Sequence, residues 1–121
     1  MSSAAKRRVA VTGIGIVSPI GISREGLWQG LKSGQSAVRT VTRFDPGMFR
    51  SRNAGEVDDF HPTDFLEQKR AKRLERFGHF AVASARLALD DSGIDLARED
   101  RERIGSMMGS ALGGVAYAES Q

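Results

Sequence analysis

The stretch Val9-Ala-Val-Thr-Gly-Ile-Gly-Ile-Val17 decides the fold class of this chain. Its apolar side chains do not alternate with polar ones, so a strand here would be apolar on both faces. Strands of this kind occur in parallel sheets that helices cover on both sides. Pro19 and Gly21 end the stretch, because proline and glycine favour turns. The sequence therefore predicts a buried strand over Val9–Val17 within an α/β fold.

A short amphipathic helix is predicted over residues 24–33, where apolar side chains recur at helical spacing. Ser23 is the expected N-cap, because a serine side chain can accept a hydrogen bond from a backbone amide of the first turn. Gly34 stands at the C-terminal cap position, where glycine takes the left-handed conformation without strain.

A longer helix is predicted from about Thr63 to about Ser92, followed by Gly93 at its C-terminal cap position. Glycine weakens a helix, so Gly78 is the expected position of any break that splits this helix into two. Its second part, Ala81 to Leu89, is rich in small side chains, so a neighbouring backbone can approach it closely.

The remaining signals are a turn over Phe44–Gly47, a short edge strand over Ala54–Val57, a second apolar strand over Ile104–Met108 and a glycine-dense loop over Gly109–Gly114. Two good strands, one poor strand and two or three helices close no standard sheet. We therefore expect residues 1–121 to be the opening segment of a longer protein.

Composition excludes several classes of protein. The chain has 121 residues and a net charge of +3, and 40% of its residues are hydrophobic, which makes intrinsic disorder improbable. It has no cysteine, which rules out disulfides, thiolate zinc sites and a catalytic thiol within these residues and fits a cytoplasmic protein. No apolar run reaches the roughly 18 residues needed to span a bilayer. Lys6-Arg7-Arg8 before the apolar stretch imitates a signal peptide, but no small-x-small cleavage pattern follows, which favours the buried strand.

One basic block stands out in the second half of the chain. Its members are Lys69, Arg70, Lys72, Arg73 and Arg76, with only Glu67 and Glu75 among them. Such a block is usually a solvated helix face, and its functional reading is a docking surface for a polyanion or an acidic protein. Aromatic side chains do not interleave with the block, which disfavours nucleic-acid binding by base stacking.

No complete catalytic constellation is present. Gly13-x-Gly15 lacks the third glycine of a dinucleotide fingerprint, and a tight turn leaving a strand is the favoured reading. The Gly109–Gly114 loop is neither a P-loop nor a nucleophile elbow, which leaves a plain turn or a close backbone approach to a ligand or a second subunit. His61 and His79 are 18 positions apart, so we expect a loop histidine and a histidine on or partly within a helix surface rather than a metal pair. We expect no catalytic residue, no metal and no cofactor within the chain.

Several blocks nevertheless resemble one family. Arg8-Val-Ala-Val-Thr-Gly-Ile-Gly-Ile-Val-Ser-Pro-Ile-Gly21 is similar to the opening strand of the β-ketoacyl-[acyl carrier protein] synthases. Further blocks follow in the family's order and at its spacing: Leu27–Ser36, Phe44-Asp45-Pro46, Ala54–Val57, Asp90–Gly93 and Arg103–Gly114. The resemblance covers nearly the whole chain and is strongest for the elongating type, in fatty-acid or polyketide synthesis.

The resemblance implies an α/β fold that is the incomplete N-terminal part of a thiolase-like αβαβα fold. Proteins with this fold are usually dimeric. By the same resemblance, residues 1–121 would be the first part of the N-terminal domain and would end before the catalytic cysteine. The resemblance also implies an acyltransferase that joins an acyl thioester to malonyl-[acyl carrier protein] by decarboxylative Claisen condensation. The family's cysteine and two histidines have no counterpart here, and His61 and His79 do not match them. By resemblance, Lys69, Lys72 and Arg73 bind the carrier protein, and Leu112 lines or gates the acyl pocket, although Ala111 stands where glycine is common.

Two alternatives remain open at the level of sequence. In the first, the chain is part of a catalytically silent ketosynthase-like partner, such as a chain-length factor, which keeps the fold without the cysteine. A small basic module that binds nucleic acid has only the basic block and the isoelectric point of 9.8 in its favour. We expect the carrier protein and the two thioesters as partners, with neither nucleic acid nor a membrane span.

Overall fold

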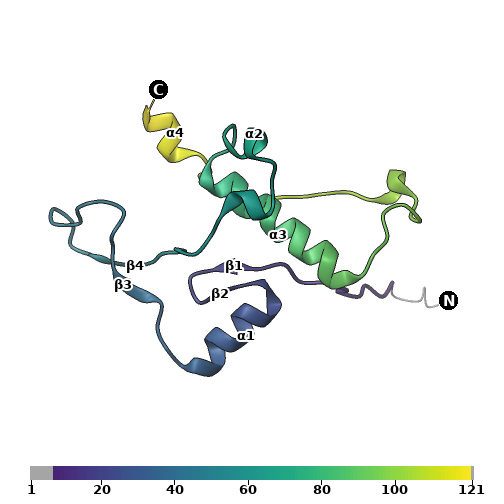
Figure 1. The fold of residues 1–121 in the computed structure, drawn as a ribbon, viewed down its shortest axis with the longest axis horizontal. Helices are drawn as coiled ribbons and strands as arrows, with labels where there is room; N and C mark the ends of the chain where they lie inside the picture. Colours follow the sequence, from purple (N-terminus) through teal and green to yellow (C-terminus); the bar gives the residue numbers. More distant parts are fainter. Residues whose placement is uncertain (1–6, 121) are drawn as a thin grey trace, which may run out of the picture.

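The longest helix, α3 (Arg76–Ser92), runs through the middle of the computed structural model, which describes residues 7–120 (Figure 1). The other elements, in chain order, are β1 (Val17–Ser18), β2 (Gly21–Ile22), α1 (Ser23–Ser33), β3 (Val38–Thr40), β4 (Asn53–Gly55), the 3-10 helix η1 (Pro62–Asp64), α2 (Gln68–Ala71), the 3-10 helix η2 (Arg101–Arg103) and α4 (Val115–Ser120). The strands form two antiparallel pairs, β1 with β2 and β3 with β4. Within residues 7–120, no helix is both long and apolar enough to cross a membrane.

The first short helix forms as predicted. Its hydrogen bonds begin at Ser23, whose φ of 70° is not helical and whose Oγ accepts a hydrogen bond from the Gly26 amide at 3.3 Å. Ser23 therefore makes the capping hydrogen bond that the sequence predicts, although the helix includes Ser23 and Ile22 occupies the N-cap position. Gly34 closes the helix in the left-handed conformation with a φ of 66°. Gly93 closes α3 in the same way with a φ of 67°, so both predicted caps are confirmed.

The predicted long helix over 63–92 is wrong as a single element, because the structure divides it into η1, α2 and α3. The break that precedes α3 falls at Glu75, whose φ of −83° and ψ of 169° are extended. Gly78 lies inside α3, and a Cβ built there would sit in ordinary contact with Leu74, 3.6 Å from its Cβ. No proline or glycine stands at the break, so the local sequence does not signal it.

A small aromatic core lies at the N-terminal part of α3. Phe60 is 4% exposed, and its ring meets the Phe80 ring edge-on with centroids 4.9 Å apart. Phe65 stacks on the other side of Phe60 at 5.7 Å. Ala83, one turn further along α3, is fully buried. These contacts fix the chain between β4 and α2 against the first turns of α3.

The extended segment 7–16 runs beside the C-terminal half of α3. A Cβ at Gly13 or Gly15 would collide with backbone atoms of that helix, so glycine is required for the approach. The Ile14 amide donates to Asp91 Oδ2 at 3.0 Å, which ties the segment to the end of α3. The approach of Gly13 and Gly15 to the backbone of Ser84 and Ala88 confirms that the alanine-rich stretch admits a neighbouring backbone. The prediction of a tight turn at Gly13–Gly15 is wrong, because the turn lies at 19–20.

The predicted strand over Val9–Val17 is wrong except at its end, where β1 begins. Val9 is 93% exposed and Val11 is 83% exposed. A strand needs hydrogen bonds to a neighbouring strand, and within the described residues no strand lies beside positions 9–16.

The predicted strand over Ile104–Met108 is likewise wrong. The segment is extended without strand pairing, and Met107 is 97% exposed. The predicted edge strand over Ala54–Val57 forms as β4, paired with β3 in the register Arg39 opposite Ala54, but it ends at Gly55. Glu56 leaves the strand because its carboxylate is held by the opposite side of the hairpin.

Candidate functional site

The basic segment, residues 67–74, surrounds the four-residue helix α2 at one end of α3 (Figure 1). Its four basic side chains are all exposed: Lys69, Arg70, Lys72 and Arg73. Arg70 lies 3.8 Å from Glu67, and both side chains are at least 75% exposed, so solvent screens this pair. Among the described residues no ion pair involves Lys69, Lys72 or Arg73. The segment therefore presents a positive surface to solvent.

Arg76 departs from the rest of the predicted basic block, because it is partly buried against the aromatic core. Its guanidinium Cζ lies 4.8 Å from the Phe80 ring centroid and 5.9 Å from that of Phe60, and its Nη2 donates to the Val57 carbonyl. Burial, together with the nearby charge of Arg43, lowers the pKa of Arg76. Arg76 thus anchors the start of α3, and the solvated face predicted for the whole block ends before it.

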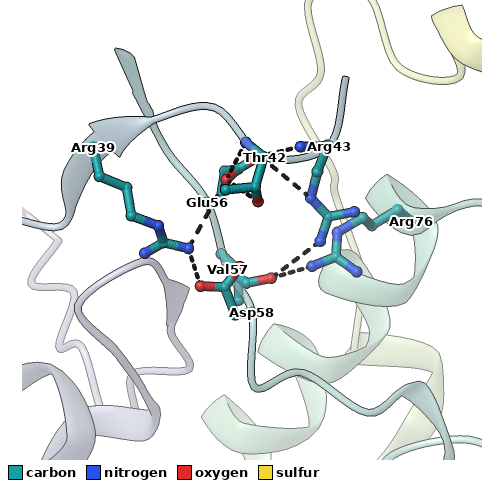
Figure 2. A network of polar contacts seen from close by, with 7 residues as sticks. All are labelled: Arg39, Thr42, Arg43, Glu56, Val57, Asp58 and Arg76. Atoms are coloured by element: carbon teal, nitrogen blue, oxygen red, sulfur yellow. Dashed lines mark hydrogen bonds and ion pairs between the residues drawn. The ribbon is translucent and has the colours of Figure 1, made fainter. Parts of the chain in front are cut away.

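A buried carboxylate, Glu56, organises the polar network behind this anchor (Figure 2). Its oxygens accept hydrogen bonds from the Thr42 amide at 3.1 Å, the Thr42 hydroxyl at 2.9 Å and the Arg43 amide at 3.2 Å. The guanidinium groups of Arg39 and Arg43 each lie 3.9 Å from it. The network ties Glu56, directly after β4, to the start of the connection that follows β3.

Charge and hydrogen bonding keep Glu56 ionised. Burial by itself raises the pKa of a carboxyl group, but the hydrogen bonds from Thr42 and Arg43 and the charge of Arg39 together lower the pKa of Glu56 below its ordinary value. The neighbouring Val57 carbonyl accepts from Arg43 at 3.3 Å and from Arg76 (Figure 2). The hairpin network and α3 are therefore joined through one backbone group.

The glycine loop over Gly109–Gly114 reaches the same end of α3. A Cβ at Gly113 would lie 3.1 Å from the Phe77 ring, and one at Gly114, whose φ is 55°, would lie 3.3 Å from Glu75 Oε2. The loop thus approaches α3 at the residue that follows the basic segment. The group that the loop approaches is this chain's own helix, so the predicted approach to a ligand or a second subunit stays a prediction.

A hollow of about 300 Å³ lies between this loop and α3. Its lining residues are Phe77, Phe80, Ala81, Ser84, Met108, Gly109 and Ser110. Leu112 is 79% exposed and is not among them, so its predicted role at an acyl pocket stays a prediction.

The two histidines lie in different elements. His61 is exposed in the loop before η1, whereas His79 is partly buried in α3 and its Nε2 lies 2.8 Å from the Ala71 carbonyl oxygen. Within the described residues no cluster of three or more metal-ligating side chains exists. Sequence reasoning missed Glu56, because a single glutamate beside a short strand carries no signal of burial, and it missed the contact of His79.

Comparison with known proteins agrees with this arrangement. Residues 6–121 match the family described as beta-ketoacyl synthase, N-terminal domain. The chain therefore belongs to the β-ketoacyl synthase family, whose members are acyltransferases. Its mixed helix-and-strand fold is part of the thiolase-like ketosynthase fold.

Particular relatives come from both fatty-acid and polyketide synthesis. The chain is 40% identical over its whole length to 3-oxoacyl-[acyl-carrier-protein] synthase 2 of Synechocystis sp., and covers 29% of that protein. It is 44% identical over 116 residues to a Streptomyces virginiae protein named as a polyketide beta-ketoacyl synthase 1, and covers 27% of it. The solved ishigamide ketosynthase/chain length factor superposes with a TM-score of 0.67 and 42% identity, over 75% of this chain and 23% of that one. The chain thus spans less than a third of the length of these relatives.

Proposed function

We propose that the chain is the N-terminal part of a 3-oxoacyl-[acyl carrier protein] synthase. The observation that carries the proposal is the exposed basic segment, held against α3 in a chain that belongs to this family. The reaction is a decarboxylative Claisen condensation in fatty-acid or polyketide synthesis. The protein works in the cytoplasm as a homodimer, and residues 1–121 are the first part of its N-terminal domain and supply no catalytic group.

In the proposed reaction an acyl group passes from its carrier thioester to a cysteine thiolate outside this chain, which releases the carrier thiol. Malonyl-[acyl carrier protein] then loses carbon dioxide, and the electron pair of the broken bond forms a carbanion. The carbanion attacks the acyl thioester, expels the cysteine thiolate and forms the new carbon–carbon bond. Both carrier-bound substrates must first dock on the enzyme.

Docking is the step that we assign to this chain. Lys69, Lys72 and Arg73 offer positive charge without an internal partner among the described residues, and an acidic carrier protein is the matching surface. Charge pairs at an exposed interface mainly raise the rate of encounter, and salt weakens them. Leu112, on the adjacent exposed glycine loop, is proposed to contact the acyl chain that the docked carrier delivers.

Charge reversal tests the docking role in the intact protein. We expect R73E to raise the Kd for the carrier protein several-fold, and the K69E/K72E/R73E triple variant to raise it by at least about tenfold at low salt. The matched control is R50E, which makes the same change at an exposed arginine outside the segment. Titration of labelled carrier protein at two salt concentrations measures the effect. Equal Kd values for R73E, R50E and the unmodified protein would contradict the docking role.

A second candidate is a chain-length-factor partner that keeps the fold without the nucleophile. The structural likeness to a ketosynthase/chain length factor favours including it. A condensation assay of the intact protein with malonyl-[acyl carrier protein] separates the two, because the enzyme turns over alone and the silent partner does not. A cysteine encoded at the nucleophile position further along the reading frame would agree with turnover.

A further inference from the structure

We propose that His79 is a positioning residue that holds the basic segment in its docking orientation. The proposal rests on the proposed function, because it concerns the surface assigned to the carrier protein. The proposal concerns a residue that lies on α3, outside the basic segment, and is not one of the three docking charges.

The contact itself fixes the direction of the hydrogen bond. His79 Nε2 lies 2.8 Å from the Ala71 carbonyl oxygen. A carbonyl oxygen can only accept, so Nε2 carries the proton and donates. Because His79 is the fourth residue of the 17-residue helix α3, the donor belongs to a well-formed element, whereas the acceptor is the last residue of α2.

The basic segment contacts η1 and, through Leu74, the first turn of α3, but few of its own groups fix its orientation. A helix of four residues is far too short to be stable alone, and α2 contains no buried residue. The Ala71 carbonyl also accepts from the Leu74 amide at 3.3 Å, but that bond stays within the segment. Across the described residues, the His79 bond is the one side-chain hydrogen bond that joins residues 67–74 to α3.

This placement has a consequence for binding. Lys69 lies in α2, and Lys72 and Arg73 directly follow the carbonyl that His79 holds. Without the bond these three charges sample more orientations, and ordering them on the carrier protein then costs conformational entropy. Loss of the donor should therefore weaken docking while the number of docking charges stays the same.

Two substitutions of equal length isolate the donor. H79Q keeps an N–H group at about the reach of Nε2, whereas H79M fills similar space without a donor. In the intact enzyme we expect H79M to raise the Kd and the KM for the carrier-bound substrate about fivefold, the factor that corresponds to one net hydrogen bond. We expect H79Q to restore both values, and kcat to stay within twofold for each variant.

The control is H61M, which makes the same change at an exposed histidine outside the contact. It should match the unmodified enzyme. A KM for H79M equal to that of H79Q would overturn the positioning role. So would a roughly fivefold loss of activity of H79M on a short thioester that lacks the carrier protein. Absence of carrier binding by the unmodified enzyme would instead overturn the proposed function. The two failures are therefore distinguishable.

Discussion

Apolar side chains are covered in one region of this chain and exposed in another. Around Phe60 the apolar side chains are covered, because Phe65, just after η1, and Phe80 of α3 pack against the Phe60 ring. In the extended segments 7–16 and 104–110 the apolar side chains face solvent, with Val9 93% and Met107 97% exposed. The difference teaches that burial depends on a partner surface, and hydrophobicity alone does not provide one.

The largest expected effect lies in the covered region. F60A removes a ring that is 4% exposed and contacts Phe65 and Phe80, and Arg76 loses one of its two aromatic neighbours. We expect a loss of stability of about 3–5 kcal/mol. The midpoint of chemical unfolding of the purified protein measures it.

The matched control for this prediction is F49A, at a phenylalanine that is 57% exposed on the β3–β4 loop. Its side chain contacts the Phe44 ring at 5.7 Å, so a smaller change is expected. Equal losses for the two variants would mean that the Phe60 cluster is not the core of this region, and the comparison between covered and uncovered regions would fail.

The next effect tests the approach of the extended segment 7–16 to α3. G15A places a Cβ against backbone atoms of α3 that no rotamer change can move, so we expect a loss of about 1–3 kcal/mol. G105A is the control, because Gly105 lies in the other extended segment and a Cβ there meets nothing within 4 Å. Thermal unfolding of both variants measures the difference. A G15A variant as stable as G105A would show that segment 7–16 does not lie against α3.

Sequence foresees the parts of this fold that depend on neighbours along the chain. The helix at Ser23–Ser33 and the caps at Gly34 and Gly93 follow from local spacing and from the freedom of glycine. The break at Glu75 does not, because no proline, glycine or capping side chain marks it in the sequence. The strands predicted over 9–17 and 104–108 are wrong for a related reason. An apolar run indicates that a segment can form a strand, but it does not indicate whether a partner strand is present.

The candidate site divides in the same way. Exposure of Lys69, Lys72 and Arg73 follows from a run of charge without apolar spacing. Arg76, at the end of that run, is drawn into the core by two aromatic rings that are distant from each other in sequence. Glu56 is held by residues of the opposite strand's continuation, and no spacing rule identifies such a partner.

The smallest expected effect concerns the pH dependence of the covered region, and Glu56 supplies it. Because folding lowers the pKa of Glu56, the folded state favours the ionised carboxylate. Its contribution to stability is complete above the ordinary pKa of a glutamate and is lost as the pH falls through the lowered value. E56Q removes the charge, so the unmodified protein should be more stable than E56Q at about pH 7, and the difference should shrink towards about pH 3.

Chemical unfolding at stepped pH values measures this difference, with D59N as the control at a nearby exposed carboxylate. D59N should follow the unmodified protein at every pH. A difference between the unmodified protein and E56Q that stays constant with pH would mean that the hydrogen bonds from Thr42 and Arg43 hold the glutamine amide and the carboxylate equally well. The charge of Glu56 would then be incidental, and shape alone would join the hairpin to α3. A difference that shrinks in acid instead assigns the junction to the ionised group, which is the arrangement that the two flanking arginines favour.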